Sequence, residues 1–198
     1  PHFIGADLRW TDDGKHLYGI YYHRGYKQLD IIEVNPETGK VRTVISDSNE
    51  TYVENNTEFR YLQDQGIGFI TSERSGWNQL YRFNWATGGI QPVTTGEFVF
   101  KQILYMDTLN KTFYFTATGK EKGENPYFLN LYRVNFDGSD LKLLTPENAS
   151  HDISISPEHH FIVDNYSTAT QPTISVLRSL ENGSLVMQLG KADISDLL

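Results

Sequence analysis

Serine and histidine are the residues of this chain that could support covalent hydrolysis. An α/β-type serine hydrolase presents its nucleophile on a sharp G-x-S-x-G turn and needs a histidine and an acid as partners. No G-x-S-x-G segment occurs in the 198 residues, and Ser75-Gly76 and Gly183-Ser184 lack the flanking glycines. None of the six histidines stands in a recognisable pairing with a nucleophile. The sequence therefore predicts no catalytic residue within this chain.

Two short pairs of side chains could instead suggest a metal ion. Asp12-Asp13 lacks the further oxygens, at fixed spacing, that a calcium loop requires. His159-His160 are adjacent, and adjacent residues of a strand point to opposite faces. The chain has no cysteine, so it has neither a thiolate metal site nor a disulfide. We expect no metal site and no cofactor.

Charge and hydropathy restrict the partners. The formal net charge is −8, whereas nucleic-acid binding needs clustered lysine and arginine. We therefore expect no nucleic-acid partner. No long apolar run is present, so no membrane span is expected, and no signal peptide is visible. Six N-x-Ser/Thr sequons would matter only in a secreted eukaryotic protein. They begin at Asn49, Asn55, Asn110, Asn148, Asn165 and Asn182.

The elements that must position any site come from an internal repeat. Residues 68–88 read as a strand, a turn, a second strand and a second turn, and this pattern occurs four times. Strand anchors are spaced by 51, 51 and 43 residues, and turn glycines by 49, 50 and 45. A period near 50 with four strands per unit is typical of a β-propeller blade. The anchors are Leu29, Leu80, Leu131 and Ile174, and the glycines are Gly39, Gly88, Gly138 and Gly183.

The repeat predicts an all-β fold, a partial β-propeller of about four four-stranded antiparallel blades. The blades are expected at residues 3–47, 57–95, 101–146 and 150–190. One such sheet leaves two apolar faces in water, so neighbouring blades must stack. Aromatic positions in the repeat are therefore expected to pack between blades rather than to form a ligand cage. These positions are Trp10, Tyr61, Phe69, Trp77 and Phe113.

Several motifs resemble known propellers. Trp10-Thr-Asp-Asp-Gly-Lys15 and Ile155-Ser-Pro-Glu158 resemble the W-S-P-D-G-K blade openings of bacterial propellers, which indicates architecture only. Longer segments resemble the dipeptidyl peptidase IV family over nearly the whole chain. They are Thr95-Gly-Glu-Phe-Val99 in place of that family's G-E-W-E-V, Phe113-Tyr-Phe-Thr-Ala-Thr118, Asn130-Leu-Tyr-Arg-Val-Asn-Phe-Asp-Gly138, Leu143-Leu-Thr145, His151-Asp-Ile-Ser-Ile-Ser-Pro157, and Asp164-Asn-Tyr-Ser167 with Pro172.

The resemblance implies a serine exopeptidase. Members of the family join an eight-bladed propeller to an α/β-hydrolase domain and remove dipeptides from N-termini, commonly after Pro or Ala. The chain is then expected to be the second half of the propeller, ending before the hydrolase domain. Its expected partners are the other propeller half, the hydrolase domain and, through the full-length enzyme, peptide substrates. A periplasmic or extracellular location in a bacterium is also expected.

The resemblance also suggests one substrate contact. The family binds the free amine of its substrate with adjacent glutamates, and this chain has no Glu-Glu pair. A Phe-Arg pair borders the pocket in family members, and Phe59-Arg60 stands at the matching place. Phe59 would form an apolar wall, and Arg60 would donate to a substrate carbonyl or carboxylate. The alternative is that Phe59 belongs to the blade core and Arg60 is a structural cation.

Two further functions stay open from the sequence. Similar repeats also build non-catalytic propellers that serve as protein-interaction scaffolds. A propeller glycosidase would need a set of inward carboxylates, which the sequence does not reveal. Four blades of a larger ring would leave two apolar faces exposed, so we expect the chain to form homo-oligomers.

Overall fold

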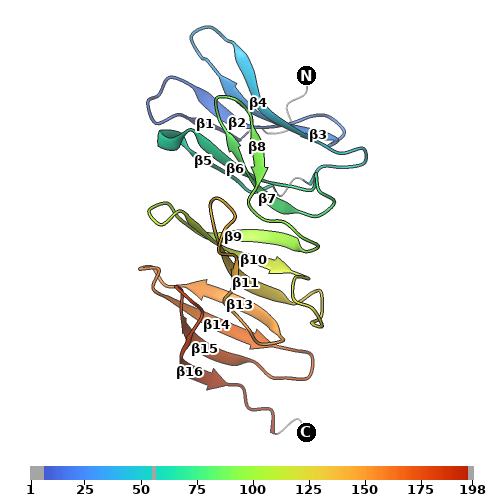
Figure 1. Cartoon of the computed structure of the whole chain (residues 1–198), viewed down its shortest axis with the longest axis vertical. Coiled ribbons are helices and arrows are strands. Elements are labelled where there is room, and N and C mark those ends of the chain that lie inside the picture. The colour runs from blue at the N-terminus through green and yellow to red at the C-terminus, as the bar shows by residue number, and fades with distance from the viewer. Residues whose placement is uncertain (1–6, 55–56, 196–198) are drawn as a thin grey trace. The chain divides into compact units, whose positions relative to one another are not determined.

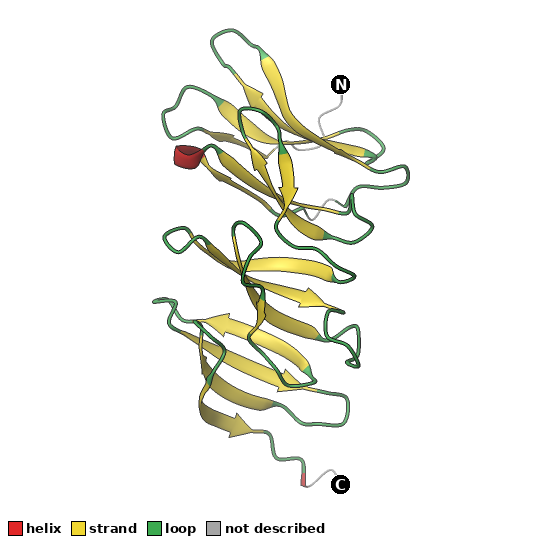
Figure 2. Ribbon diagram, in the orientation of Figure 1, coloured by secondary structure: helices red, strands yellow, loops and turns green. Residues whose placement is uncertain are grey.

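A computed structural model describes residues 7–54 and 57–195 (Figures 1 and 2). The chain divides into two compact units, Pro1–Thr95 and Gly96–Leu198, and each contains two four-stranded sheets. The described residues form strands, turns and a single-turn 3₁₀ helix, η1 (Gln63–Gln65), with no α-helix. None of the helical structure described is long and apolar enough to cross a membrane.

The first unit holds two sheets in which each strand pairs antiparallel with the next along the chain. Predicted residues 3–6 of the first blade lie outside the described residues. The first sheet contains β1 (Asp7–Trp10), β2 (Leu17–Tyr22), β3 (Gln28–Val34) and β4 (Val41–Ser48). The second contains β5 (Phe59–Leu62), β6 (Ile67–Ser72), β7 (Gln79–Asn84) and β8 (Ile90–Pro92).

The second unit repeats this arrangement, which confirms the predicted all-β fold of four-stranded antiparallel sheets. Its outer strands differ greatly in length, a feature that the repeat did not predict. The third sheet contains β9 (Val99–Asp107), β10 (Thr112–Thr118), β11 (Leu129–Asn135) and β12 (Lys142–Leu143). The fourth contains β13 (Ser150–Ile155), β14 (Phe161–Ser167), β15 (Ile174–Ser179) and β16 (Leu185–Lys191).

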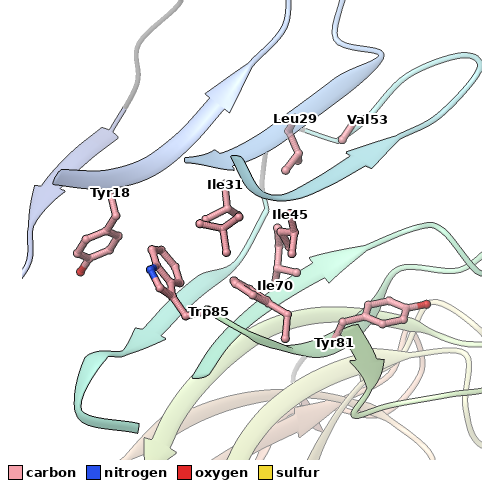
Figure 3. Packing of buried hydrophobic residues seen from close by; sticks show 10 residues of the cluster. Tyr18, Leu29, Ile31, Ile45, Val53, Ile70, Tyr81 and Trp85 are labelled. Atoms are coloured by element: carbon pink, nitrogen blue, oxygen red, sulfur yellow. The ribbon is translucent and has the colours of Figure 1, made fainter. Parts of the chain in front are cut away.

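Apolar side chains from both sheets of the first unit form one core (Figure 3). Ile31 and Ile45 of the first sheet and Ile70 of the second are buried in it. The ring of Trp85, in the turn after β7, stacks on Tyr61 with centroids 3.6 Å apart. Burial of apolar side chains at about 1.5–3 kcal/mol each makes this packing the main force joining the two sheets.

The predicted aromatic packing is only partly correct. Phe69 and Phe113 are fully buried, and Tyr61 packs against the core. Trp10 and Trp77, however, are exposed large side chains. Trp10 ends strand β1 and Trp77 lies in the turn between β6 and β7, so neither occupies a mid-strand position that faces a neighbouring sheet.

The turn glycines of the repeat have a clear structural role. Gly88 and Gly183 adopt φ values of 71° and 75°, a region that favours glycine. A Cβ on Gly88 would lie 2.6 Å from the Val44 carbonyl oxygen, and one on Gly183 would lie 2.4 Å from that of Leu144. Each turn therefore packs on the backbone of the preceding sheet, which explains why the sequence places glycine there.

Candidate functional site

A small polar pocket lies in the first unit, where the connection between β4 and β5 meets the turn between β6 and β7. Its volume is about 20 Å³, enough for about one water molecule or one ligand group. Eleven of its twelve lining residues have polar side chains. The lining residues are Asp47, Ser48, Asn49, Tyr52, Val53, Glu54, Thr57, Thr71, Ser72, Glu73, Arg74 and Asn78.

An ion pair fixes one wall of this pocket. Arg74 Nη2 lies 3.1 Å from Asp47 Oδ1, and Arg74 Nε donates to Ser72 Oγ at 3.0 Å. The guanidinium also lies over the ring of Tyr81, 5.1 Å from its centroid. Asp47 is buried, so the pair is better shielded from water than a surface salt bridge. These contacts give Arg74 a structural role in the turn between β6 and β7.

The β4–β5 connection also contributes to the pocket lining. Val53 is buried and its backbone N–H donates to the Tyr26 carbonyl at 2.6 Å, which anchors the connection. Tyr52 is exposed beside Tyr26, with ring centroids 5.8 Å apart. With the carboxylates of Glu54 and Glu73 in the lining, the site offers an aromatic surface and acceptors for hydrogen-bond donors or a cation. The sequence did not predict this site, because residues 47–57 resemble an ordinary polar linker. They form a pocket only together with the turn between β6 and β7.

Phe59 and Arg60, the predicted substrate contacts, begin strand β5. Phe59 is half-buried and packs on Phe83, with centroids 6.5 Å apart, and edge-on against Tyr18. Arg60 pairs with Glu58 at 2.9 Å and donates to the carbonyl of Phe59. Neither residue is among those that line the polar pocket. Their role in substrate binding stays a prediction.

A buried carboxylate organises the outer half of the first sheet. Asp30 Oδ1 accepts hydrogen bonds from Ser46 Oγ at 2.7 Å and Gln28 Nε2 at 3.0 Å. Asp30 Oδ2 lies 2.7 Å from His23 Nε2. Burial by itself raises the pKa of Asp30, but the hydrogen bonds from Ser46, Gln28 and His23 outweigh burial and hold the pKa below its ordinary value.

A second buried carboxylate lies in the fourth sheet. Asp164 Oδ2 accepts from Arg178 Nε at 2.9 Å, and Asp164 Oδ1 lies 2.7 Å from His151 Nδ1. Arg178 Nη2 also donates to Glu147 Oε2 at 2.6 Å. Burial lowers the pKa of Arg178, but its bonds to Glu147 and Asp164 outweigh burial and raise that pKa. The guanidinium is therefore the cation that balances this cluster.

Of the residues that the structure describes, Glu147, His151 and Asp164 form the one donor set close enough to hold a metal ion. Both carboxylates already accept from Arg178, and His151 Nε2 lies 3.0 Å from the Glu147 carbonyl oxygen. A metal ion would have to displace a buried arginine and break these bonds. The arrangement fits a structural ion cluster better than a metal centre.

The remaining chemical candidates lie in turns. The ring of His159 stacks on Tyr105 with centroids 3.7 Å apart, and His160 is exposed. Asp13 accepts hydrogen bonds from the Thr11 hydroxyl and from the Lys15 backbone within its own turn. These bonds lower the pKa of Asp13, and the bond from Thr11 contributes most. Ser75 Oγ donates to the Trp77 carbonyl. His2 and the sequon at Asn55 lie outside the described residues.

The chain is similar in sequence to a dipeptidyl peptidase and in fold to solved peptidase structures. A dipeptidyl peptidase 4 named in Trichophyton verrucosum (strain HKI 0517) is 25% identical over 177 residues, covering 84% of this chain and 23% of the relative. The crystal structure of Porphyromonas gingivalis dipeptidyl peptidase 4 superposes with a TM-score of 0.74 and 17% identity. It covers 92% of this chain and 25% of that one.

A second crystal structure, described as a dipeptidyl aminopeptidase IV of Bacteroides ovatus ATCC 8483, gives a TM-score of 0.76 and 24% identity. It covers 97% of this chain and 29% of that one. The chain thus spans about a quarter of the length of these relatives. The family described as the dipeptidyl peptidase IV (DPP IV) N-terminal region matches residues 2–173. The resemblance seen in the sequence is therefore confirmed, and the chain belongs to the dipeptidyl peptidase IV N-terminal region family.

Proposed function

We propose that the chain is propeller structure of a DPP IV-like serine exopeptidase and that it helps to bind and gate peptide substrates. An α/β-hydrolase domain elsewhere in the protein supplies the nucleophile, and this chain is not catalytic by itself. The match of residues 2–173 to the family is the observation that carries the proposal. A periplasmic or extracellular location is part of the proposal.

The polar pocket of the first unit supports a binding role. The Arg74–Asp47 pair fixes one wall, and the exposed ring of Tyr52 is part of the lining. A volume of about 20 Å³, close to that of one water molecule, suits one small end group of a peptide rather than a whole ligand. Phe59-Arg60 is the second candidate contact, predicted from the family and separate from this pocket.

Steady-state kinetics of the full-length protein would test the binding role. We expect Tyr52→Ala to lower kcat/KM for a peptide with Pro or Ala at its second position by about ten-fold, the scale of one lost hydrogen bond. Arg60→Ala tests the family-derived contact in the same assay. Lys101→Ala, an exposed position on β9, is the matched control and should leave kcat/KM unchanged.

The results of the two variants distinguish the pocket contact from the Phe59-Arg60 contact, and a separate test addresses the peptidase role. Loss with Arg60→Ala alone would favour the Phe59-Arg60 contact over the pocket. If neither variant lowers kcat/KM, neither contact binds the substrate, and the proposed binding role is contradicted. A full-length gene without a downstream G-x-S-x-G segment, together with a protein that releases no dipeptides, would sink the peptidase proposal and favour the interaction scaffold.

A further inference from the structure

A large cavity lies in the second unit, where three turns meet. Its volume is about 680 Å³, within the range of roughly 300–1,000 Å³ that is typical of sites for small ligands. The lining comes from the β9–β10, β13–β14 and β15–β16 turns and the strand ends beside them. Neighbouring strands of these sheets are antiparallel, so the turn after the first strand and the turn after the third lie at the same end of a sheet. This is how segments far apart in the sequence come to share one cavity.

Three stacked rings form part of the cavity lining. The imidazole of His159 lies on the ring of Tyr105, with centroids 3.7 Å apart and planes 5° from parallel. Tyr105 in turn stacks on Tyr114, with centroids 5.8 Å apart. Tyr114 is buried and His159 is exposed, so the imidazole ends the stack on the solvent side. A planar ring in this position offers a surface on which a flat, weakly polar face of a ligand can pack.

Backbone hydrogen bonds hold the turn that carries His159. Its φ of 54° is uncommon for a residue other than glycine, and its N–H donates to the Ser156 carbonyl at 2.9 Å. Ser156 Oγ accepts from the N–H groups of His160 and Phe161 at 3.2 and 3.1 Å. The N–H of Leu180 donates to the His160 carbonyl at 2.9 Å, which ties the β15–β16 turn to the β13–β14 turn. This wall is therefore formed before any ligand binds, which lowers the entropic cost of binding.

The lining also supplies hydrogen-bonding groups of both kinds. The exposed carboxylates of Glu158 and Glu181 can accept hydrogen bonds, and the guanidinium of Arg133 can only donate them. Arg133 Nη2 donates to Asp140 Oδ2, which holds the guanidinium in place. Because carboxylates and a guanidinium share one lining, a ligand with a large net charge of either sign meets a like charge. The lining therefore suits an uncharged ligand that both donates and accepts hydrogen bonds.

We propose that this cavity binds a neutral saccharide of two or three rings. A sugar ring has a face of C–H groups, which packs on the imidazole of His159. Its hydroxyl groups donate to the carboxylates of Glu158 and Glu181 and accept from the guanidinium of Arg133. The cavity volume matches a ligand of this size. This inference does not depend on the proposed peptidase role, because the cavity shares no residue with the polar pocket of the first unit.

Isothermal titration calorimetry of the whole chain with maltose, cellobiose and maltotriose tests the proposal. At least one of these sugars should bind with a Kd of about 1 mM or tighter. His159→Asn removes the ring but keeps a residue type that tolerates positive φ, and it should weaken binding about ten-fold. Glu181→Gln removes a charged acceptor and should weaken binding about three-fold or more.

A matched control and a charged probe complete the experiment. Glu97→Gln removes an exposed carboxylate that does not line the cavity, and it should leave the affinity unchanged. Circular dichroism verifies that each variant is folded. The proposal is overturned if none of the three sugars binds at about 10 mM, or if they bind equally well to His159→Asn and to Glu181→Gln. A lysine dipeptide that binds more tightly than every sugar would also overturn it, because the cavity would then be a site for cations.

Discussion

Two buried aspartates, one in each unit of the chain, are stabilised in different ways. Asp30 in the first unit accepts from the neutral donors Ser46 and Gln28 and contacts His23, which is partly exposed. Asp164 in the second unit is fully buried and lies between His151 and Arg178, whose side chains are also almost inaccessible. Neutral hydrogen-bond donors stabilise the Asp30 carboxylate, whereas the Asp164 carboxylate belongs to a buried ion cluster.

The difference predicts different sensitivity to substitution. A carboxylate held by several neutral donors keeps partial solvation when one donor is lost. A carboxylate balanced by one buried cation becomes an uncompensated charge when that cation is removed. Substitutions in the Asp164 cluster should therefore lower the unfolding free energy more than substitutions around Asp30. The sequence did not predict that either aspartate is buried. Four substitutions or conditions test this contrast, from the largest expected effect to the smallest.

Arg178→Met should have the largest effect. It leaves Asp164 and Glu147 without their cation, and removal of one partner of a buried pair costs about 3–5 kcal/mol of unfolding free energy. Urea unfolding, monitored by far-ultraviolet circular dichroism, measures the loss of unfolding free energy. Arg24→Met, at an exposed turn position, is the matched control and should change the free energy by less than about 0.5 kcal/mol.

A double variant sharpens this prediction. Arg178→Met combined with Asp164→Leu removes both charges, and replacement of a buried pair by apolar groups is often close to neutral. The double variant should therefore recover part of the stability lost in Arg178→Met. If it is less stable than the single variant by the full cost of Asp164→Leu, the cluster is not a coupled ion pair.

Gly183→Ala should have the next largest effect, because its turn also supports the second cluster. The Gly183 carbonyl accepts from Arg178 Nη1 at 3.3 Å, and a Cβ at this position would collide with the backbone of Leu144. Positive φ costs about 1–2 kcal/mol for alanine, and a forced backbone shift adds about 1–3 kcal/mol. Gly39→Ala, the same turn of the first sheet, has φ 68° and open space around it.

This pair of glycine variants separates two causes. Gly39→Ala should lose only the conformational part, about 1–2 kcal/mol, in thermal or urea unfolding. Equal losses for Gly39→Ala and Gly183→Ala would mean that the contact with Leu144 contributes nothing to stability.

Asp30→Asn should have a smaller effect than either change in the second unit. The amide keeps the shape and one acceptor oxygen, while the charged hydrogen bonds from Ser46 and Gln28 are weakened, at a cost of about 1–2 kcal/mol. Unfolding free energies at neutral pH measure it. A loss as large as that of Arg178→Met would contradict the view that neutral donors make the first cluster tolerant.

The pH dependence of stability in the acid range should show the smallest difference between the unsubstituted chain and Asp30→Asn. The pKa of Asp30 is lowered in the folded protein, so its contribution is present above the unfolded value of about 3.9 and is lost as pH falls through the folded pKa. The gap in unfolding free energy between the unsubstituted chain and Asp30→Asn should therefore narrow below about pH 4. A gap that is constant from neutral pH to pH 3 would show that the charge of Asp30 does not stabilise the fold.

Much of the fold was predictable from local sequence. The turn Asn84-Trp-Ala-Thr-Gly88 shows why: Asn84 Oδ1 accepts from the backbone of Ala86 and Thr87, and Gly88 supplies the positive φ. These are short-range interactions, so spacing alone revealed the period and the four-stranded units. The lengths of the outer strands were not predictable from local spacing: β12 pairs with β11 at two positions only, whereas β16 follows β15 over seven residues with two bulges of its own.

The candidate site was much less predictable. Asp47 and Arg74 are 27 residues apart, and no motif joins them in the sequence, yet they form the wall of the polar pocket. Asp164 and Arg178 likewise meet only through the register of β14 and β15. Phe59 and Arg60 were identified from the family, and their contacts in the structure are with the core and with Glu58.

The sequence by itself determined the all-β class, the fourfold repeat and membership of the dipeptidyl peptidase IV N-terminal region family, since each of these is written in local spacing and segment likeness. Only the tertiary structure decided which carboxylates are buried, which cation balances them and which outer strand is left apolar and exposed. Such features depend on contacts between residues distant in sequence, and their energies are set by desolvation, which no single segment specifies.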